Sequence, residues 1–235
     1  MVQVGSTDGK ATRSYRSSHR EAGARRTRQR VLQAAGSVFV ARGYAGATIR
    51  AIAAEAGVSV PTVELLSGTK ARLLKAAIDV AIAGDDEPVA VLDRGWTSEA
   101  AGSASVEEFL AIVASVVGAA QARSAGLVLA VFEGSSRTPE LAELTEQMIR
   151  QRAITAGWIV DGLAGKADLH DELTRQDAVD TMWLLMEPAV FDRLVRHRRW
   201  SVDRYQDWFA RTARRLLVAD TPPSRPRSAR RRRSP

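Results

Sequence analysis

Basic residues at two predicted helix starts are the clearest chemical feature of this sequence. Lys70 and Arg72 fall in the first turn of a predicted helix that has no acid there, although a helix N-terminus is already partly positive and usually prefers Asp or Glu. An anion at this turn would be held by the free backbone amides together with Lys70. A second group repeats the arrangement at an earlier helix start: Arg25, Arg26, Arg28 and Arg30. The pattern favours contact with a phosphate backbone, whereas each cation taken alone could simply face water.

Residues that usually carry catalysis are scattered along the chain. The three histidines, His19, His170 and His197, are isolated, and no HExxH motif or glycine-rich phosphate loop occurs. Glu107 and Glu108 are adjacent, so they point in different directions on a helix. The absence of cysteine excludes a disulfide framework, thiolate metal ligands and a cysteine nucleophile. We therefore expect neither an enzyme nor a bound metal or other cofactor.

The net charge of +7 is divided unevenly along the chain. Residues 25–75 hold nine Lys or Arg against two acids, whereas residues 76–220 hold fifteen basic and twenty-three acidic residues. The last fifteen residues add six arginines and no acid. A basic N-terminal part joined to an acidic remainder predicts nucleic acid as the partner of the first part. The alternative for the charge alone is a solvated surface.

The composition is that of a soluble globular protein. Of the 235 residues, 45% are hydrophobic and 26% are charged, a balance that allows one domain or two. The first thirty residues have no apolar core for a signal peptide. The longest nearly apolar run, Phe109 to Ala120, is too short to span a bilayer. We therefore expect a cytoplasmic protein with no membrane partner.

Hydrophobic residues recur at helical spacing, and no stretch alternates as a strand, so we predict an all-α fold. Four parts are expected: a disordered arm over 1–24, a helix-turn-helix domain over 25–83 (the headpiece), a helical domain over 84–219 (the large domain), and a basic disordered tail over 220–235. Headpiece helices are predicted to start at Thr27, Thr48, Ser59 and Thr69. Three of them are predicted to end at Gly43, Gly57 and Gly84. For the large domain we predict an irregular connection over 84–105 with a helical piece near 89–92, then helices near 105–122, 124–134, 138–163, 174–198 and 201–218. Pro188 predicts a kink or break.

The first three predicted headpiece helices meet the geometric demands of a helix-turn-helix. Gly57 lets the chain reverse sharply in the second turn, while Val58 fills the angle between the helices. In such a unit the third helix enters the major groove by its N-terminal end, and the second helix crosses the backbone. Together with the charge, this geometry favours DNA binding over an ordinary three-helix corner.

Three headpiece segments resemble the TetR family of regulators: TRQRVLQAAGSVFVARGY (27–44), TIRAIAAEAGVS (48–59) and TVELLSGTKARLL (62–74). The remaining residues match only in the number and order of predicted helices. The resemblance implies a homodimer that binds a palindromic or nearly palindromic double-stranded DNA operator. It also implies that the large domain serves dimerisation and holds a pocket for a small-molecule effector. A repressor that this effector releases from DNA is expected, while repression against activation stays open. Neither the operator nor the effector follows from the sequence.

DNA contacts are expected from ten headpiece residues. Arg28 is included for its place at a helix start and Ser59 as the cap of the third helix. The resemblance implies that Thr48, Arg50 and Lys70 touch phosphates. It also implies that five residues lie at the groove: Val60, Pro61, Thr62, Glu64 and Leu65. Many relatives carry Tyr, His and Phe where this chain has Glu64, Leu65 and Ser67. Glu64 could instead accept a hydrogen bond from cytosine N4, and Leu65 could pack on a thymine methyl group.

Apolar residues of the large domain are expected to be mostly core, with a minority lining an effector pocket. The candidates for that lining are Phe109, Val113, Val116, Phe132, Met148, Trp158, Trp183 and Met186. Possible polar contacts are Glu133, Asp161, Asp180 and Glu187, although a solvated or salt-bridged surface role is favoured for each of these acids taken singly. The apolar faces of 182–194 and 205–217 predict a homodimer built from the last two long helices.

A different function is possible for the arginine-rich segment Arg225–Arg233. It would suit a sequence-tolerant nucleic-acid binder, which would show steep salt dependence without preference for one operator.

Overall fold

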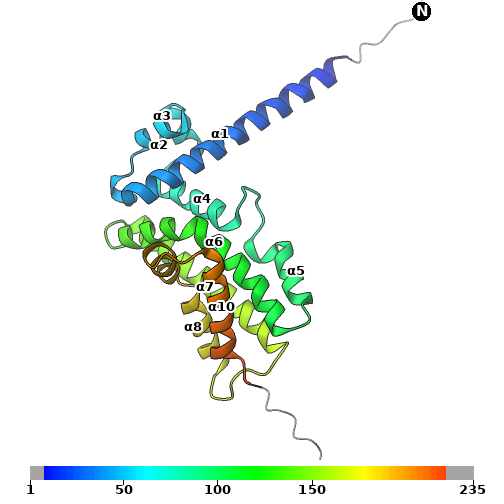
Figure 1. Ribbon diagram of the computed structural model, residues 1–235. Helices are drawn as coiled ribbons and strands as arrows, with labels where there is room; N and C mark the ends of the chain where they lie inside the picture. The colour runs from blue at the N-terminus through cyan, green and yellow to red at the C-terminus, as the bar shows by residue number, and fades with distance from the viewer. Residues whose placement is uncertain (1–7, 221–235) are drawn as a thin grey trace, which may run out of the picture.

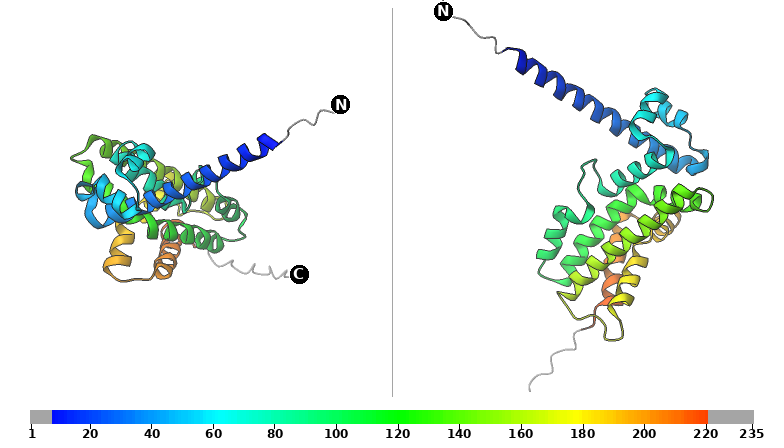
Figure 2. Two further views of the ribbon diagram at one scale, coloured as in Figure 1. Left: turned by 90° about the horizontal axis from the view of Figure 1, so that it is seen from above. Right: turned by 180° about the vertical axis from the view of Figure 1, so that it is seen from behind.

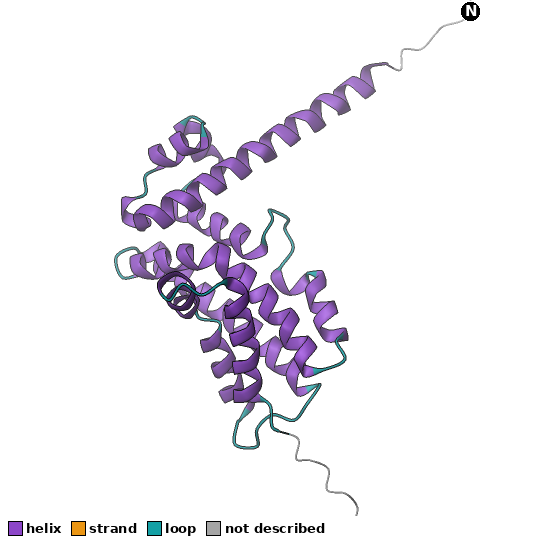
Figure 3. Cartoon of the chain, in the orientation of Figure 1, coloured by secondary structure: helices purple, strands orange, loops and turns teal. Residues whose placement is uncertain are grey.

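The computed structural model describes residues 8–220, and over this range the chain is helical apart from its connections (Figure 3). An isolated bridge between Leu169 and Val218 is the only strand-like pairing in this range. The α-helices are α1 (Asp8–Gly46), α2 (Ile49–Ala56), α3 (Val60–Ser67), α4 (Lys70–Ala83), α5 (Gly95–Gly102), α6 (Val106–Ser135), α7 (Pro139–Ala164), α8 (Arg175–Leu185), α9 (Pro188–Phe191) and α10 (Val202–Leu217). A 3₁₀ turn, η1 (Val91–Asp93), and a π-helical turn, η2 (Asp192–His197), complete the series. The predicted all-α fold is confirmed.

Local signals place the headpiece helices correctly. The side chains of Thr48, Ser59 and Thr69 each accept a hydrogen bond from a backbone amide in the first turn of α2, α3 and α4. Gly57 and Gly84 follow α2 and α4 with φ of 63° and 91°, in the left-handed region that favours glycine.

The first helix is longer than predicted. It begins at Asp8 rather than near Thr27, so residues 8–24 are helical instead of a disordered arm. The expectation of disorder rested on the lack of apolar residues to bury, but Ala, Arg, Lys and Glu in this segment favour helix locally and continue the headpiece helix outward. Gly43 interrupts α1 with φ 64° and ψ 176°, at the predicted stop. Residues 1–7, and all but Asp220 of the predicted basic tail, lie outside the described residues.

Three helix predictions in the large domain need correction. The connection over 84–105 contains α5, whose Gly95 and Gly102 stand at its ends, while Thr97 and Ala100 are buried. The two helices predicted over 105–134 are one continuous helix, α6. The helix predicted over 174–198 is not continuous: α8 ends at Leu185 and α9 begins at Pro188, which confirms the break predicted at this proline.

Two hydrophobic cores hold the chain together. One core lies within the large domain and is formed by the helices from α5 through α10. The other core joins the headpiece to one end of α6 and α7. Leu127, Val131 and Leu141 from α6 and α7 are buried with Phe39 and Leu74 of the headpiece. Figure 1 shows α6 running through the large domain up to α4 and the headpiece. The continuity of α6 is explained by this packing, since its two halves serve different cores.

Helix α6 is long and apolar enough, by length and composition, to cross a membrane, which the expectation from Phe109–Ala120 did not anticipate. Half of its most apolar eighteen-residue window is buried inside the protein. Phe109, Val113 and Val131 on this helix are fully covered by other helices. The apolar composition of α6 is therefore that of a core helix.

Candidate nucleic-acid interface and effector domain

The turn between α2 and α3 has the geometry of a helix-turn-helix. The Gly57 N–H donates to the carbonyls of Ala53 and Ala54, and the Val58 N–H donates to Ala53 O at 3.0 Å, which closes the end of α2. Ser59 then caps α3, accepting from the Thr62 N–H at 3.3 Å. Ile52, Ala56 and Val63 are buried and fix the angle between the two helices. The first turn of α3 is thus held rigidly with its outer face free.

The outer face of α3 carries the predicted groove residues. Leu65 is 88% exposed, an unusual position for a leucine in a compact protein, and Pro61 and Glu64 are exposed beside it. Val60 and Thr62 are half-buried. An exposed apolar side chain next to an exposed acid suits base edges better than it suits water or phosphates.

The hydroxyl groups among the expected DNA contacts already serve the headpiece itself. Thr48 Oγ1 accepts from the Ala51 N–H at 3.1 Å, and Ser59 Oγ shares a hydrogen bond with Thr62 Oγ1 at 2.8 Å. Arg28 and Arg50 are exposed on α1 and α2. The predicted residues therefore divide into helix caps, which orient the backbone, and free side chains, which can reach a ligand.

Lys70 has partners that the sequence did not suggest. Its Nζ donates to Tyr44 O at 2.8 Å and to Ala47 O at 3.1 Å, and lies 4.1 Å from the centroid of the Tyr44 ring. Tyr44 lies in the last turn of α1 and Ala47 in the turn that follows, where helix-end carbonyls lack intrahelical donors. Lys70 thus ties the start of α4 to the start of α2 through the α1–α2 turn. Its partners lie more than twenty residues away, so local spacing gives no signal for this contact.

Ser67 stands where many relatives carry Phe, but it destabilises the headpiece less than an unpaired polar side chain would. Its Oγ donates to Val63 O at 2.7 Å one turn earlier in α3, so the polar group is satisfied although it is part-buried. The adjoining Leu66 is half-buried and packs against the headpiece core.

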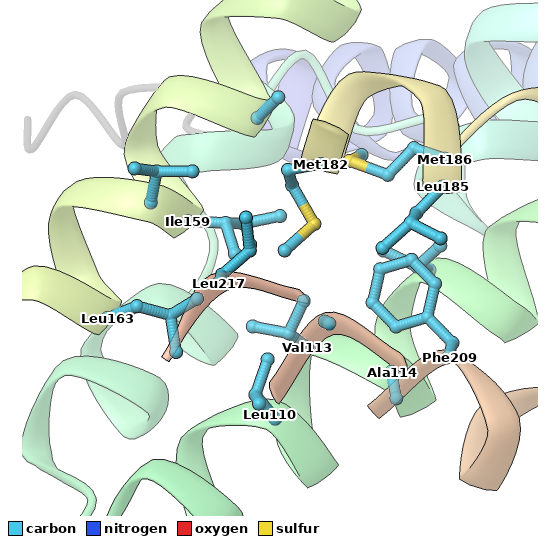
Figure 4. Close-up of a cluster of buried hydrophobic side chains, with 14 of the residues drawn as sticks. Leu110, Val113, Ala114, Ile159, Leu163, Met182, Leu185, Met186, Phe209 and Leu217 are labelled. Carbon is cyan, nitrogen blue, oxygen red and sulfur yellow. The ribbon is translucent and has the colours of Figure 1, made fainter. Parts of the chain in front are cut away.

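The eight predicted effector residues do not form one group. Phe109, Val113, Trp158, Trp183 and Met186 belong to the large-domain core or pack against it, whereas Phe132 and Met148 pack against the headpiece core. Val116 is half-buried on α6. Phe109 stacks on Trp158 with ring centroids 6.0 Å apart, and a Cβ at Gly162 would lie 2.6 Å from the Phe109 ring. Figure 4 shows Met182, Met186, Val113 and their neighbours pointing toward one another in this close-packed core.

Two polar groups lie inside the large domain. Gln121 is buried on α6, and its Nε2 donates to Met186 O at 2.7 Å while its Oε1 has no partner among the described atoms. Arg152 forms an ion pair with Glu187 and stacks on Trp183, 4.1 Å from the ring centroid. Burial lowers the pKa of Arg152 against the opposing effect of Glu187. These groups brace the break between α8 and α9.

The other acids considered as effector contacts lie at the surface. Asp161 pairs with Arg175 at 2.7 Å, and hydrogen bonds from Arg175 lower the pKa of that carboxyl group. Asp180 accepts from Gln176, and Glu133 is exposed. Within residues 22–220, no group of three or more His, Asp or Glu side chains is placed to hold a metal ion.

A hollow lies between the headpiece and the large domain, and none of the predicted effector residues lines it. It measures about 730 Å³ and is lined by α1, α4 and α6, including Leu32, Gly36, Val40 and Leu127. Asp85 stands at its rim, where hydrogen bonds from Arg94 lower the carboxyl pKa to about 2. A second hollow of about 490 Å³ is lined by Arg25, Arg28, Leu66 and the 86–88 loop. Both are open to the surface.

A helix-turn-helix headpiece followed by a larger helical domain is typical of helix-turn-helix DNA-binding proteins. Residues 31–77 match the family model described as bacterial regulatory proteins, tetR family. The chain therefore carries the TetR-family N-terminal domain, which confirms the resemblance drawn from the headpiece segments.

Solved structures extend the likeness to most of the chain. NalD of Pseudomonas aeruginosa, a repressor of a multidrug efflux pump, is 18% identical with a TM-score of 0.63, over 84% of this chain and 100% of its own. FadR of Bacillus subtilis, solved with stearoyl-CoA, is 17% identical with a TM-score of 0.61, over 79% and 96%. FadR of Bacillus halodurans is 17% identical with a TM-score of 0.60, over 79% and 93%. At these identities the likeness establishes the fold. No curated protein sequence matches this chain significantly.

Proposed function

We propose that this chain is a one-component transcriptional repressor that binds a palindromic operator as a homodimer and leaves it when a small-molecule effector binds. The observation that supports this most directly is the exposed outer face of α3, with Leu65 and Glu64, on a strongly basic headpiece. Among the proteins of similar fold, NalD is a repressor, and FadR of Bacillus subtilis is a transcriptional regulator that binds an acyl-CoA. We further propose a cytoplasmic protein without enzymatic activity.

The proposed DNA contacts follow the division of the headpiece residues. Arg28, Arg50 and Lys70 approach phosphates, while the caps Thr48 and Ser59 hold the backbone amides of α2 and α3 toward the duplex. The groove is approached by Val60, Pro61, Thr62, Glu64 and Leu65 from the start of α3. In this arrangement phosphates set the orientation, and Glu64 and Leu65 select bases.

Selection of duplexes from a fragmented genomic pool by the purified full chain tests the proposal. Enrichment of one sequence with twofold symmetry is expected, since a dimer presents two copies of α3 related by a twofold axis. Binding of all duplexes alike, with steep salt dependence, would contradict it and favour the sequence-tolerant binder with an arginine-rich tail. That tail, Arg225–Arg233, lies outside the described residues.

Helix α4 is the proposed connection between effector and DNA. Lys70 at its start bonds the α1–α2 turn, and the carbonyls of Ala81 and Ile82 at its end accept hydrogen bonds from Arg123 of α6. A ligand that favours a different placement of α6 against α4 must weaken DNA binding by the same coupling free energy, typically about 1 to 3 kcal/mol. Calorimetric titration of one ligand into the free protein and into its operator complex should give different affinities. Equal affinities for a ligand that binds both would contradict the coupling.

The proposed homodimer cannot use the apolar face of 205–217, contrary to the sequence expectation. Tyr205, Phe209, Ala213 and Leu217 are fully covered within one chain by packing of α10 into the large-domain core. The exposed apolar side chains left on α8 and α10 are Leu184, at 59%, and Leu216, at 48%. We therefore propose that the dimer forms through the outer sides of α8 and α10.

A further inference from the structure

The first half of α1 projects away from the rest of the molecule. Figure 1 and Figure 2 show its outer part leaving the headpiece as a straight helix, and only its base, at Arg25 and Arg28, approaches Leu66 and the 86–88 loop. The helix begins at Asp8, and the first of its residues in the headpiece core are Val31 and Leu32. We call residues 8–30 the arm helix.

The arm helix is the most densely basic helical segment of the described chain. Its acids are Asp8 and Glu21 alone, and its cations are Lys10, Arg13, Arg16, Arg20, Arg25, Arg26, Arg28 and Arg30. In the large domain many arginines are paired with acids, as Arg94 is with Asp85 and Arg214 with Glu107. The four arginines nearest the headpiece are exposed, and none forms an ion pair with an acid within residues 22–220. Like charges at such spacing repel along a helix, so the arm suits a polyanion as its partner.

The arm has the length and attachment of a DNA-binding element. Twenty-three residues of α-helix reach about 35 Å, close to the roughly 34 to 36 Å of one turn of the duplex. The same helix packs on α2 and α4, so the direction of the arm is fixed relative to α3. The headpiece match begins only at residue 31, which leaves the arm outside it.

From this charge, exposure and rigid attachment we propose that the arm helix is a second DNA-contacting element, which lies along the phosphates beside the half-site approached by α3. The inference rests on the proposed function. The arm adds affinity and footprint length without base selection, because its cations contact phosphates rather than base edges. Each phosphate contact releases condensed counterions, which steepens the dependence of binding on salt.

The test uses the full chain, the duplex that it selects from the genomic pool, and a triple variant Arg13→Gln, Arg16→Gln, Arg20→Gln. These positions are spaced i, i+3 and i+7, on one side of a helix and away from the headpiece core. The matched control removes three exposed charges outside the proposed DNA and dimer surfaces, Arg193→Gln, Arg198→Gln and Arg199→Gln, none of which forms an ion pair within residues 22–220. Affinity is measured over a series of salt concentrations, and protection from hydroxyl radicals is mapped on long duplexes.

Because a dimer carries two arms, the arm variant removes six arginines from the complex. It is expected to lower the slope of log affinity against log salt by about five, near 0.9 for each phosphate no longer neutralised. It should shorten the protected region beside each half-site by up to about one helical turn, or roughly ten base pairs. The control should match the unmodified chain, and a duplex cut back to the symmetric core should bind both proteins alike. If the arm variant keeps the same salt slope and footprint while sequence selection is intact, the proposal that the arm helix contacts DNA is wrong, and the proposed function still stands. Failure of the full chain to select any duplex would overturn the proposed function and the arm together.

Discussion

Arg123 on α6 donates a hydrogen bond from Nε to the carbonyl oxygen of Ala81 on α4, at 2.7 Å. Its Nη2 donates to the Ile82 carbonyl at 3.1 Å, so one guanidinium satisfies two of the carbonyls that the end of α4 leaves free. A Cβ at Gly84 would lie 3.2 Å from this Nη2, which favours glycine there in addition to its positive φ. A cation at the negative end of the helix dipole makes this a favourable attachment of the large domain to the headpiece.

Replacement of Arg123 by Gln should weaken this attachment. We expect the free energy of unfolding to fall by about 1 kcal/mol, because the variant loses the charge at the end of α4 together with at least one of its hydrogen bonds. Arg137→Gln is the control, since Arg137 is exposed just after α6 and its side chain has no partner among the described residues. Chemical denaturation of the two variants measures the difference. Equal stability of both would mean that the Arg123 contacts contribute nothing net.

The pair of Arg152 and Glu187 should be costly to break from one side. Their side chains are only 11% and 19% exposed, and the pair joins α7 to the corner before α9. Glu187→Leu leaves the guanidinium buried without its carboxylate, so we expect a loss of about 3 kcal/mol. Arg152→Met combined with Glu187→Leu should lose clearly less than the sum of the single changes.

The exposed pair of Lys75 and Asp79 provides the contrast for that cycle. Both side chains are more than a third exposed and lie one turn apart on α4. Asp79→Leu should change the unfolding free energy by less than about 1 kcal/mol, as exposed pairs usually do. Additive losses in the Arg152 and Glu187 cycle would show that those two residues do not stabilise each other.

Leu184→Glu should dissociate the proposed dimer. A charge placed in an apolar contact must be desolvated when two chains meet, whereas on the free surface of α8 it costs little. Ile154→Glu on α7 is the matched control, because Ile154 is 63% exposed but lies outside the two proposed helices. Sedimentation at micromolar concentration measures the masses of both variants. If the Ile154 variant alone becomes monomeric, the dimer surface lies on α7 and the assignment to α8 and α10 is wrong.

The sequence predicted best those features that depend on neighbours in the chain. Thr48, Ser59 and Thr69 cap helices through amides three residues away, and Gly57 supplies the positive φ needed at the end of α2. The positions of the headpiece helices followed from these signals. The continuity of α6 did not follow from such signals, because the polar residues near Arg123 resemble a helix boundary. Arg123 is explained only by its contact with α4, which lies far away in the sequence.

Long-range packing also explains why the sequence could not show which of the predicted effector residues lie together. Apolar spacing identifies which side of a helix is buried but not which helix covers it, so Phe132 and Met148 were grouped with residues of the other core. The same limit hid the partners of Lys70, whose carbonyls come from the α1–α2 turn. Chemistry carried by one turn of helix was predictable, and chemistry assembled between helices was not.

Lys70→Ala should weaken binding to operator and random DNA by about the same factor. Removing one phosphate-neutralising charge from each protomer lowers the slope of log affinity against log salt by roughly one per protomer, or about two for the dimer. The same variant also loses the hydrogen bonds to Tyr44 O and Ala47 O. This structural loss should lower the melting temperature of the protein. Measuring both quantities separates the two roles. Lys75→Ala is the control, because Lys75 lies on the same helix but pairs with Asp79.

Glu64→Ala should fail in a different way, because Glu64 is exposed on α3 and forms no ion pair with a described residue. Removing a carboxylate that phosphates repel should leave binding to random DNA equal or stronger. Discrimination at one base pair of each half-site should fall by about 1 to 3 kcal/mol, the usual contribution of a hydrogen bond to a base edge. Competition titrations on operator and scrambled duplexes at two salt concentrations compare this variant with Lys70→Ala. If Glu64→Ala keeps the base preference while Lys70→Ala changes it, α3 does not lie in the groove as proposed.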